Sequence, residues 1–359
     1  MGMKVVFPYF GEESGMLHYT SELANSLADV VEVYVLLRNH ELEEYFGREV
    51  NIVELNSDIY NLLTNSRKHL SNIDPDIVHA TSNHYLEILV TSFSRTCGRI
   101  FTIHNPYPHE GMEFLLYDYP AKKLRSVLSE ALIVHGKQSK IDAVQRGYPE
   151  NKLNIVNHGI YSRFKKFEES DEKHGEKMVL FFGSIRPNKG FDRITDISAK
   201  ILEKSPNIRV VVAGNTETPL QINQEVVNDI AEELRQSNNL EFKEGYIPDT
   251  EVAELFSKAT VLILPYYDGS QSGVAMIARA FETPIVATDV GDLPEIVSHG
   301  ETGYIVKSES NNKISENALE IIEKEELRER MEHNISVSNS KYTWEEISKD
   351  IISVYKRYL

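Results

Sequence analysis

The sequence predicts an α/β protein made of two doubly wound, Rossmann-like domains. Short β-branched runs alternate with amphipathic segments of helix length along the whole chain, which is typical of parallel sheets. The two halves repeat this plan on either side of a charged stretch with almost no apolar residues, KKFEESDEKHGEKM at 165–178. Because doubly wound sheets bind ligands beyond the carboxyl ends of their strands, we expect two domains facing each other across a cleft.

The expected strands number six in each half of the chain. They are 4–10, 31–37, 76–80, 99–104, 130–136 and 153–159, followed by 178–184, 209–214, 240–246, 260–265, 284–289 and 303–306. The chain then divides into an N-terminal domain at 1–164, a linker at 165–177, a C-terminal domain at 178–340 and a final segment at 341–359. In that segment Trp344, Ile347, Ile351 and Val354 (or Tyr355) recur at helical spacing, so we expect a helix that crosses back toward the N-terminal domain.

Composition narrows the classes of function. The 359 residues carry a formal net charge of −17, which argues against nucleic acid as a partner. The single cysteine, Cys97, rules out an internal disulfide and fits a reducing cytoplasm. We find no signal peptide and no apolar run long enough to span a bilayer, so we expect a cytoplasmic protein. The basic segments 121–140 and 163–167 are either solvated surface or a peripheral contact with the inner face of the membrane.

A cationic loop follows the first strand of the second half. The stretch FFGSIRPNKG (181–190) runs from apolar residues to Arg186 and Lys189 at a predicted helix start. Free backbone N–H groups and the helix dipole favour an anion there, and glycine lets the backbone approach it closely. The natural ligand is a phosphate or diphosphate. The alternative is a solvated loop whose cations meet Asp192 or another carboxylate on the surface.

A second loop of the same half has a similar character. After the strand that ends at Pro265 comes YYDGSQSG (266–273), and then a helix with an apolar face. Ser270, Ser272 and Gly273 at this helix start offer hydroxyl and backbone N–H groups to an anion. Ordinary N-capping by Ser272 is the alternative. Two such loops at neighbouring strand ends suit a diphosphate.

The N-terminal half offers weaker signals. FGEESG (10–15) lacks the GxGxxG spacing and carries two glutamates, so we expect it to face a hydroxyl-bearing partner rather than a phosphate. Histidines end several strands: His79, His104, His135 and His158. Each is expected to be a hydrogen-bonded structural residue, although His104 precedes a Pro- and Gly-rich loop of the kind that lines clefts. No spacing typical of a metal site is present, so no metal is expected.

Taken together, these motifs resemble a known family. FFGSIRPNKG is similar to the phosphate-binding G-x-x-R-x-x-K-G loop of retaining glycosyltransferases with the GT-B fold, glycosyltransferase family 4. Residues 265–306, from PYYDGSQSGV to GYIV, resemble the donor-site block of that family, in an SQSGV-type variant. PDIVHA, FTIHN, KLNIVNHGI and YTWEEISKDIISVY also follow the family order, so the resemblance covers nearly the whole chain.

The resemblance implies metal-independent transfer of a hexose, with retention of configuration, from a UDP- or GDP-linked sugar to a hydroxyl acceptor. The acceptor would be a saccharide, a lipid-linked saccharide or a small polyol on the N-terminal domain, and no cofactor is implied beyond the donor substrate. Arg186 and Lys189 match the cations that hold the diphosphate, and His104 matches a histidine near the donor sugar. The expected donor-binding residues are Gly183, Ser184, Arg186, Lys189, Tyr246, Gln271, Ser272, Gly273 and Val274.

The chain departs from the family at several positions. Many members carry two glutamates where this sequence has Gly269 and Ile277, the first holding sugar hydroxyls and the second the ribose. Asp268 and Gln271 are candidates to replace them. A nucleotide-sugar epimerase or a sugar phosphorylase on the same fold, and a non-catalytic two-domain solute-binding protein, remain alternatives.

Overall fold

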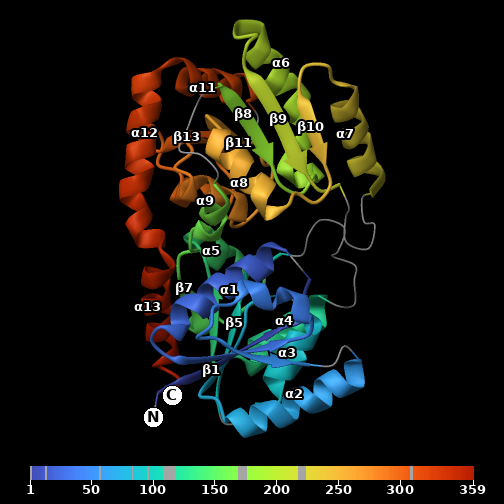
Figure 1. Cartoon of the computed structure of the whole chain (residues 1–359), viewed down its shortest axis with the longest axis vertical. Coiled ribbons are helices and arrows are strands. Elements are labelled where there is room, and N and C mark those ends of the chain that lie inside the picture. Colours follow the sequence, from blue (N-terminus) through green and yellow to red (C-terminus); the bar gives the residue numbers. More distant parts are fainter. Residues whose placement is uncertain are drawn as a thin grey trace. The chain divides into compact units, whose positions relative to one another are not determined.

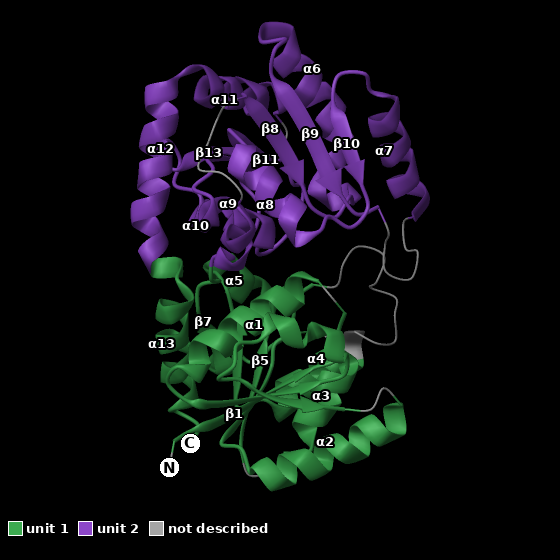
Figure 2. Ribbon diagram, in the orientation of Figure 1, with its two compact units in different colours: residues 1–159, 341–359 green, residues 160–340 purple. Residues whose placement is uncertain are grey.

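Two parallel sheets, one in each half of the chain, organise the structure (Figure 1). The computed structural model describes residues 2–12, 14–55, 58–82, 84–94, 97–107, 118–168, 176–216, 224–307 and 310–359. Residues 1–159 and 341–359 form one compact unit, unit 1, and residues 160–340 form the other, unit 2 (Figure 2). The chain therefore passes between the units twice, after Gly159 and after Ser340.

The sheet of unit 1 has seven parallel strands in the order β3-β2-β1-β4-β5-β6-β7. Val5, Val6 and Phe7 in its first strand are fully buried, as expected for a strand covered on both faces. The chain winds outward from β1 in both directions, so the order reverses between β1 and β4. The strands are β1 (Lys4–Tyr9), β2 (Glu32–Leu37), β3 (Asn51–Glu54), β4 (Ile77–Ala80), β5 (Gly98–Thr102), β6 (Ala131–Val134) and β7 (Leu153–Ile155).

Helices cover both faces of this sheet (Figure 1). The last helix, α13, packs against α1 in unit 1, where Ser348 Oγ donates to Ser26 Oγ at 2.9 Å. It begins at the cap residue Thr343, whose hydroxyl accepts a hydrogen bond from Glu346 N. The helices are α1 (Gly15–Ala28), η1 (His40–Tyr45), α2 (Ile59–Ile73), α3 (Tyr85–Ser92), α4 (Asp118–Leu128), α5 (Lys137–Gln145), η2 (Glu150–Lys152) and α13 (Trp344–Tyr355).

Unit 2 repeats the arrangement with six parallel strands in the order β10-β9-β8-β11-β12-β13. Here the order reverses between β8 and β11, which pair with Val261 opposite Val179. A continuous apolar core that includes Phe181, Val212 and Ile263 surrounds the strands. The strands are β8 (Met178–Phe182), β9 (Arg209–Gly214), β10 (Glu241–Glu244), β11 (Val261–Leu264), β12 (Ile285–Thr288) and β13 (Gly303–Val306).

The helices of unit 2 also lie on both sides of its sheet (Figure 1). The short segment η3, directly after the first passage between the units, packs onto α8 and α9, and Arg163 Nε pairs with Asp249 at 3.2 Å. The helices are η3 (Ser162–Phe167), η4 (Pro187–Lys189), η5 (Phe191–Arg193), α6 (Ile194–Lys204), α7 (Gln224–Gln236), α8 (Asp249–Lys258), α9 (Gly273–Ala280), α10 (Leu293–Ile296), α11 (Asn311–Glu323), α12 (Glu325–Ser338) and η7 (Asn339–Tyr342), which reaches into unit 1.

The predicted fold class, two doubly wound parallel sheets, is confirmed, and each expected strand corresponds to an observed one. The sequence reading missed β3, because NIVE at 51–54 is short and has only two apolar residues. The stripe expected on the final helix is buried as predicted, with Ile347, Ile351 and Tyr355 at 0% exposure. Part of the expected linker, residues 169–175, lies outside the described residues.

Candidate donor site

The cationic loop lies at the centre of the unit 2 sheet, at the carboxyl end of β8. Gly183 and Gly190 both take positive φ angles, 127° and 68°, which the tight path of the loop requires. Gly190 has no room for a side chain, since a Cβ there would lie 2.0 Å from the carbonyl oxygen of Pro265. The glycines that frame Arg186 and Lys189 thus bring this loop against the one that follows β11.

Hydrogen bonds between the two loops complete this contact. The carbonyl oxygen of Asn188 accepts from the backbone N–H groups of Tyr267 at 2.9 Å and Asp268 at 3.2 Å. Gly291 closes the other side, because a Cβ there would meet the carbonyl oxygens of Gly269 and Ser270 at 2.2 and 2.5 Å. The two loops that the sequence places at neighbouring strand ends therefore form one continuous wall at the switch point of unit 2.

The two cations of this wall have no carboxylate partner among the residues that the structure describes. Within the described part of the chain, neither Arg186 nor Lys189 forms a salt bridge, and the buried Nε of Arg186 has no hydrogen-bond partner. Asp192, the expected surface partner, instead accepts a hydrogen bond from the Tyr267 hydroxyl at 2.9 Å. The alternative in which the loop cations are neutralised by Asp192 is therefore wrong.

Burial makes these charges costly. It lowers the pKa of Lys189 to about 8, with the nearby positive charge of Arg186 acting in the same direction and Asp268 in the opposite one. Burial also lowers the pKa of the Arg186 guanidinium. Partly buried cations without counter-ions are costly unless a ligand supplies the opposite charge, so we expect the wall to receive an anion.

The start of α9 lies in the same wall. The Ser272 hydroxyl caps the helix by accepting from Ala275 N at 3.3 Å, which leaves the first N–H groups of the helix, at Gly273 and Val274, at its positive end. The Nε2 of Gln271, just before the cap, is buried and has no partner among the described residues. N-capping by Ser272 is thus confirmed, and a binding role for this helix start stays a prediction.

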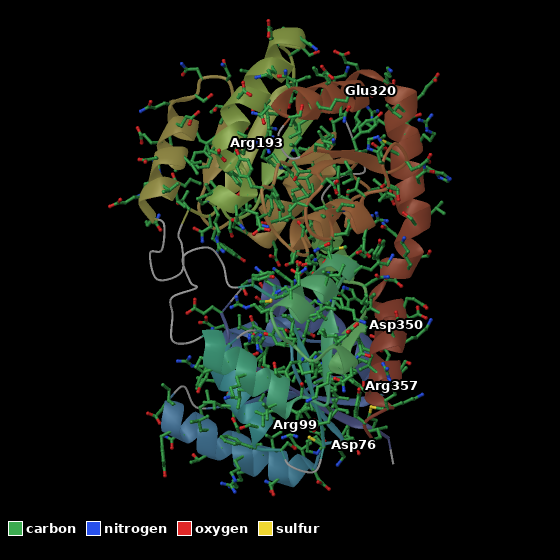
Figure 3. The ribbon with its side chains drawn as sticks, turned by 180° about the vertical axis from the view of Figure 1, so that it is seen from behind. Asp76, Arg99, Arg193, Glu320, Asp350 and Arg357 are labelled. Atoms are coloured by element: carbon green, nitrogen blue, oxygen red, sulfur yellow. The ribbon has the colours of Figure 1, made fainter. Side chains whose placement is uncertain are left out.

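Two residues that the sequence motifs did not identify support the wall. The Tyr266 ring lies under Lys189, with Nζ 3.9 Å from the ring centroid. Arg193, buried inside unit 2 (Figure 3), donates from Nη1 to the carbonyl oxygen of Pro265 at 3.1 Å and from Nε to Asn311 Oδ1 at 2.6 Å. Tyr266 and Arg193 could have been identified from the sequence, because an aromatic residue and an arginine there lie directly beside the two glycine-rich loops.

The remaining donor candidates lie in the same two loops or at the end of β10. Ser184 is exposed and follows Gly183 in the cationic loop. Tyr246 lies just beyond β10 and is 54% exposed. Of the two positions that hold glutamates in many relatives, Gly269 lies in the wall and Ile277 is buried within α9. Asp268 is exposed, and its Oδ1 accepts from Gly269 N at 2.8 Å.

Unit 1 gathers its histidines beneath the carboxyl end of its own sheet. His104, His135 and His158 follow β5, β6 and β7, and their ring centroids lie 4.9 to 6.1 Å apart around the buried ring of Tyr19. His79, in β4, bonds to the hydroxyls of Tyr355 and Thr102 at 2.7 and 2.8 Å. Burial lowers all four pKa values, that of His79 to about 3 and that of His135 to about 4.

The structural role expected for these histidines is confirmed for three of them. His135 Nδ1 bonds to the Val156 carbonyl and His158 Nδ1 to the Gly159 carbonyl, at 2.9 and 2.7 Å, and His79 bonds as described above. His104 is 8% exposed, and its Nε2 lies 3.0 Å from the carbonyl oxygen of Thr81. The Thr81 carbonyl therefore fixes the orientation of the His104 ring. No group of metal-ligating side chains is present among the described residues.

The switch point of unit 1 is closed by a buried carboxylate. Glu87 on α3 accepts from the backbone N–H of Phe10 at 3.0 Å and from the hydroxyl of Ser82 at 2.6 Å, and burial raises its pKa to about 7. Glu87 thereby joins the ends of β1 and β4. Beyond β1 lies a cavity of about 490 Å³, lined by Phe10, Gly11, Glu12, Arg38, Asn39, His40, Glu54 and Leu55. Glu13 and residues 108–111 of the two expected cleft loops lie outside the described residues.

Comparison with known families assigns both halves of the chain. The sequence model of Glycosyltransferase Family 4 matches residues 14–163, and that of Glycosyl transferases group 1 matches residues 162–336. The boundary between the two matches falls next to the passage from unit 1 to unit 2. The chain belongs to the family 4 glycosyltransferases.

Individual relatives of this glycosyltransferase are distant. A D-inositol 3-phosphate glycosyltransferase of Corynebacterium efficiens is 29% identical over 50% of this chain and 42% of its own length. The chain thus spans about half the length of several of the curated relatives that it matches.

Solved structures share the whole fold of this glycosyltransferase. The HepE protein of Anabaena in complex with UDP-glucose has a TM-score of 0.77 at 14% identity, over 99% of this chain and 100% of that one. Sucrose-phosphate synthase of Thermosynechococcus elongatus also has a TM-score of 0.77, at 15% identity over 99% and 98% of the two chains. The GT-B fold is therefore shown for the full length. Among the described residues, no helix is both long and apolar enough to cross a bilayer.

Proposed function

We propose that the chain transfers a hexose from a nucleotide diphosphate sugar, UDP- or GDP-linked, to a hydroxyl acceptor, with retention of anomeric configuration. The observation that carries the proposal is the wall of unit 2, where Arg186 and Lys189 lie without a carboxylate partner among the described residues, beside the start of α9. Such a site matches the doubly charged diphosphate of a nucleotide sugar. The complex of HepE with UDP-glucose gives the same fold a nucleotide-sugar ligand and so supports the assignment.

The chemistry follows from where charge develops. When the bond between the anomeric carbon and the diphosphate breaks, the departing oxygen keeps the electron pair and gains negative charge. Arg186, Lys189 and the N–H groups of Gly273 and Val274 stabilise that charge more strongly in the transition state than in the ground state, which lowers the barrier. The acceptor oxygen bonds to the anomeric carbon as its O–H bond breaks, and the proton passes to the departing diphosphate oxygen or to water. These side chains supply the positive charge that a metal supplies in other transferases.

The other substrate would bind on unit 1. The polar cavity beyond β1 suits a hydroxyl-rich molecule such as a saccharide, a lipid-linked saccharide or a small polyol. His104, on the floor formed by the histidines, is proposed to lie near the donor sugar, with its ring oriented by the Thr81 carbonyl. Gly183, Ser184, Tyr246, Gln271 and Ser272 complete the proposed donor contacts. A cytoplasmic location and a peripheral membrane contact belong to the same proposal.

The test combines binding with turnover. In excess EDTA, UDP, GDP and ADP are added separately to the purified chain, and its melting temperature is measured. One of them should raise it by several degrees, since a ligand at 100 times its Kd stabilises the folded state by about 2.7 kcal/mol. The matching nucleotide sugar should then release its diphosphate in the presence of a panel of saccharides and polyols.

Other outcomes would contradict the proposal. No shift with any diphosphate would remove the donor site, and activity restored only by Mg²⁺ would refute the metal-free mechanism. Release of an altered nucleotide sugar without acceptor would indicate an epimerase, and a requirement for free phosphate would indicate a phosphorylase.

A further inference from the structure

We propose that Gly269 and Tyr266 keep the Lys189 ammonium free for the ligand, so that the side chain at position 269 determines how tightly this site holds a diphosphate. The inference rests on the proposed donor function and goes beyond it. Neither Gly269 nor Tyr266 carries charge, and both lie beside Lys189.

Position 269 lies within reach of that ammonium. A Cβ built on Gly269 would lie 3.6 Å from Lys189 Nζ and 3.8 Å from Cδ2 of Tyr266, both ordinary van der Waals distances. The backbone of Gly269 does not have a positive φ, so a larger residue fits there without strain. This distance places a carboxylate attached at position 269 within ion-pairing reach of Lys189. Glycine at 269 removes that competitor.

Tyr266 takes the place of a counter-ion. Its ring is almost fully buried, 4% exposed, and presents its face to Nζ at 3.9 Å. A ring face attracts a cation but, unlike a carboxylate, does not neutralise it. The Tyr266 hydroxyl lies 3.4 Å from the hydroxyl of the helix cap Ser272, so the same ring also sets the position of the ammonium relative to α9.

The other charged groups around Lys189 leave it available. Arg186 is a like charge and repels it, and Asp268 is exposed, with Oδ1 already accepting a hydrogen bond from Gly269 N. The unpartnered buried atoms of the wall, Arg186 Nε and Gln271 Nε2, are hydrogen-bond donors. A site that presents donors and cations suits an anion of high charge density. Sugar hydroxyls, which also need acceptors, are held less strongly here than the diphosphate.

The experiment compares two variants that differ by one charge. Calorimetric titration with UDP at pH 7, in EDTA, is carried out on the wild type, Gly269→Glu and Gly269→Gln. Glutamate should weaken UDP binding about 10- to 100-fold, because the diphosphate must displace a charge-assisted hydrogen bond. Glutamine, of the same size but uncharged, should weaken it less than threefold. Equal losses in both variants, or no loss with glutamate, would overturn the proposal.

Two further measurements separate the inference from the proposed function. If wild-type protein binds neither UDP, GDP, ADP nor inorganic pyrophosphate, the donor function itself fails. Independently of any ligand, the Lys189 side-chain NMR signal should titrate at higher pH in Gly269→Glu than in the wild type, because the added carboxylate stabilises the charged form. An unchanged titration in a folded variant would show that position 269 does not reach Lys189.

The role of Tyr266 is tested by its ring. Tyr266→Phe keeps the ring face and loses the hydroxyl, whereas Tyr266→Leu loses both. We expect the phenylalanine variant to keep UDP affinity within about threefold of the wild type, and the leucine variant to lose about tenfold. Similar UDP affinities for the two variants, whether both are near the wild type or both are reduced, would contradict a positioning role for the ring face.

Discussion

The two units share one plan but treat the carboxyl ends of their sheets in opposite ways. Each sheet reverses its strand order beside its first strand, between β1 and β4 in unit 1 and between β8 and β11 in unit 2. In unit 1 the buried Glu87 bonds to the residues after both strand ends, and buried neutral histidines follow β5, β6 and β7 at the same end of the sheet. In unit 2 it carries cations whose charges meet no carboxylate among the described residues.

This difference is the one expected between polar groups that stabilise the fold and polar groups that bind a ligand. Polar groups that are buried and paired in the folded chain stabilise and position it, and they leave little for a ligand to complete. Polar groups that are buried and unpaired cost free energy until a ligand binds. Pairing in unit 1 is incomplete, since His135 Nε2 has no partner among the described residues, but its buried histidines are neutral. We therefore expect unit 1 to provide a neutral floor and unit 2 to provide the charges that a diphosphate completes. Three changes test this contrast.

The largest effect is expected from acid, and in unit 1. Its buried histidines have lowered pKa values, so the unfolded chain binds more protons and the free energy of unfolding decreases as the pH falls below about 6.5. For His135 alone, with a pKa of about 4, the loss at pH 5 is about 2 kcal/mol. Glu87, whose pKa is raised to about 7, acts in the opposite direction but is a single group.

Calorimetry at pH 7 and pH 5 measures this effect. The transition of unit 1 should move to lower temperature more than that of unit 2, where the described histidines, His299 and His333, are exposed. In His135→Asn the difference between the two pH values should shrink, even if the variant is less stable at pH 7. Equal shifts of both transitions, or an unchanged pH dependence in the variant, would show that the histidines do not cause the acid sensitivity.

A smaller effect is expected where the two loops of unit 2 meet. Gly190→Ala adds a Cβ 2.0 Å from the Pro265 carbonyl oxygen, so the loops must separate. Gly300→Ala is the matched control, since Gly300 also has a positive φ, 78°, but open space around its Cβ. Gly300→Ala should lose about 1 kcal/mol of stability through backbone strain, and Gly190→Ala should lose more because its Cβ also overlaps a backbone oxygen. Only Gly190→Ala should also lose UDP affinity, by more than about tenfold. Equal UDP affinities would refute the continuous wall.

The third change removes single charges. Lys189→Ala and Arg186→Ala each remove a charge-assisted hydrogen bond worth about 1.5–3 kcal/mol, so kcat/KM should fall about 10- to 100-fold. Lys200→Ala on α6, where the ammonium pairs with Asp196, is the control and should leave kcat/KM within about twofold. Circular dichroism should show all three folded. Wild-type turnover in either loop variant would remove the functional assignment of these cations.

The sequence predicted the architecture well because its strands are buried on both faces and read as apolar runs. It also placed the two glycine-rich loops of unit 2 at neighbouring strand ends, and the structure joins them through the Asn188 carbonyl. β3 escaped prediction because its pairing with β2, rather than its own composition, makes it a strand.

Other features depend on contacts between residues far apart in the sequence. The neutral state of the histidines requires the burial that Tyr19 and Trp344 help to provide, and Trp344 lies almost two hundred positions from His158. The support of Lys189 by Tyr266, and of Pro265 by Arg193, likewise appears only when the loops are folded together. These roles depend on distances between side chains in the folded protein, and the periodicity of the sequence does not predict such distances.

The most direct test of the central claim is a crystal structure of the chain grown with UDP. The account predicts the diphosphate within hydrogen-bonding distance of Lys189 Nζ, of the Arg186 guanidinium and of the N–H groups of Gly273 and Val274. A diphosphate bound elsewhere, with the two cations still unpartnered, would contradict it.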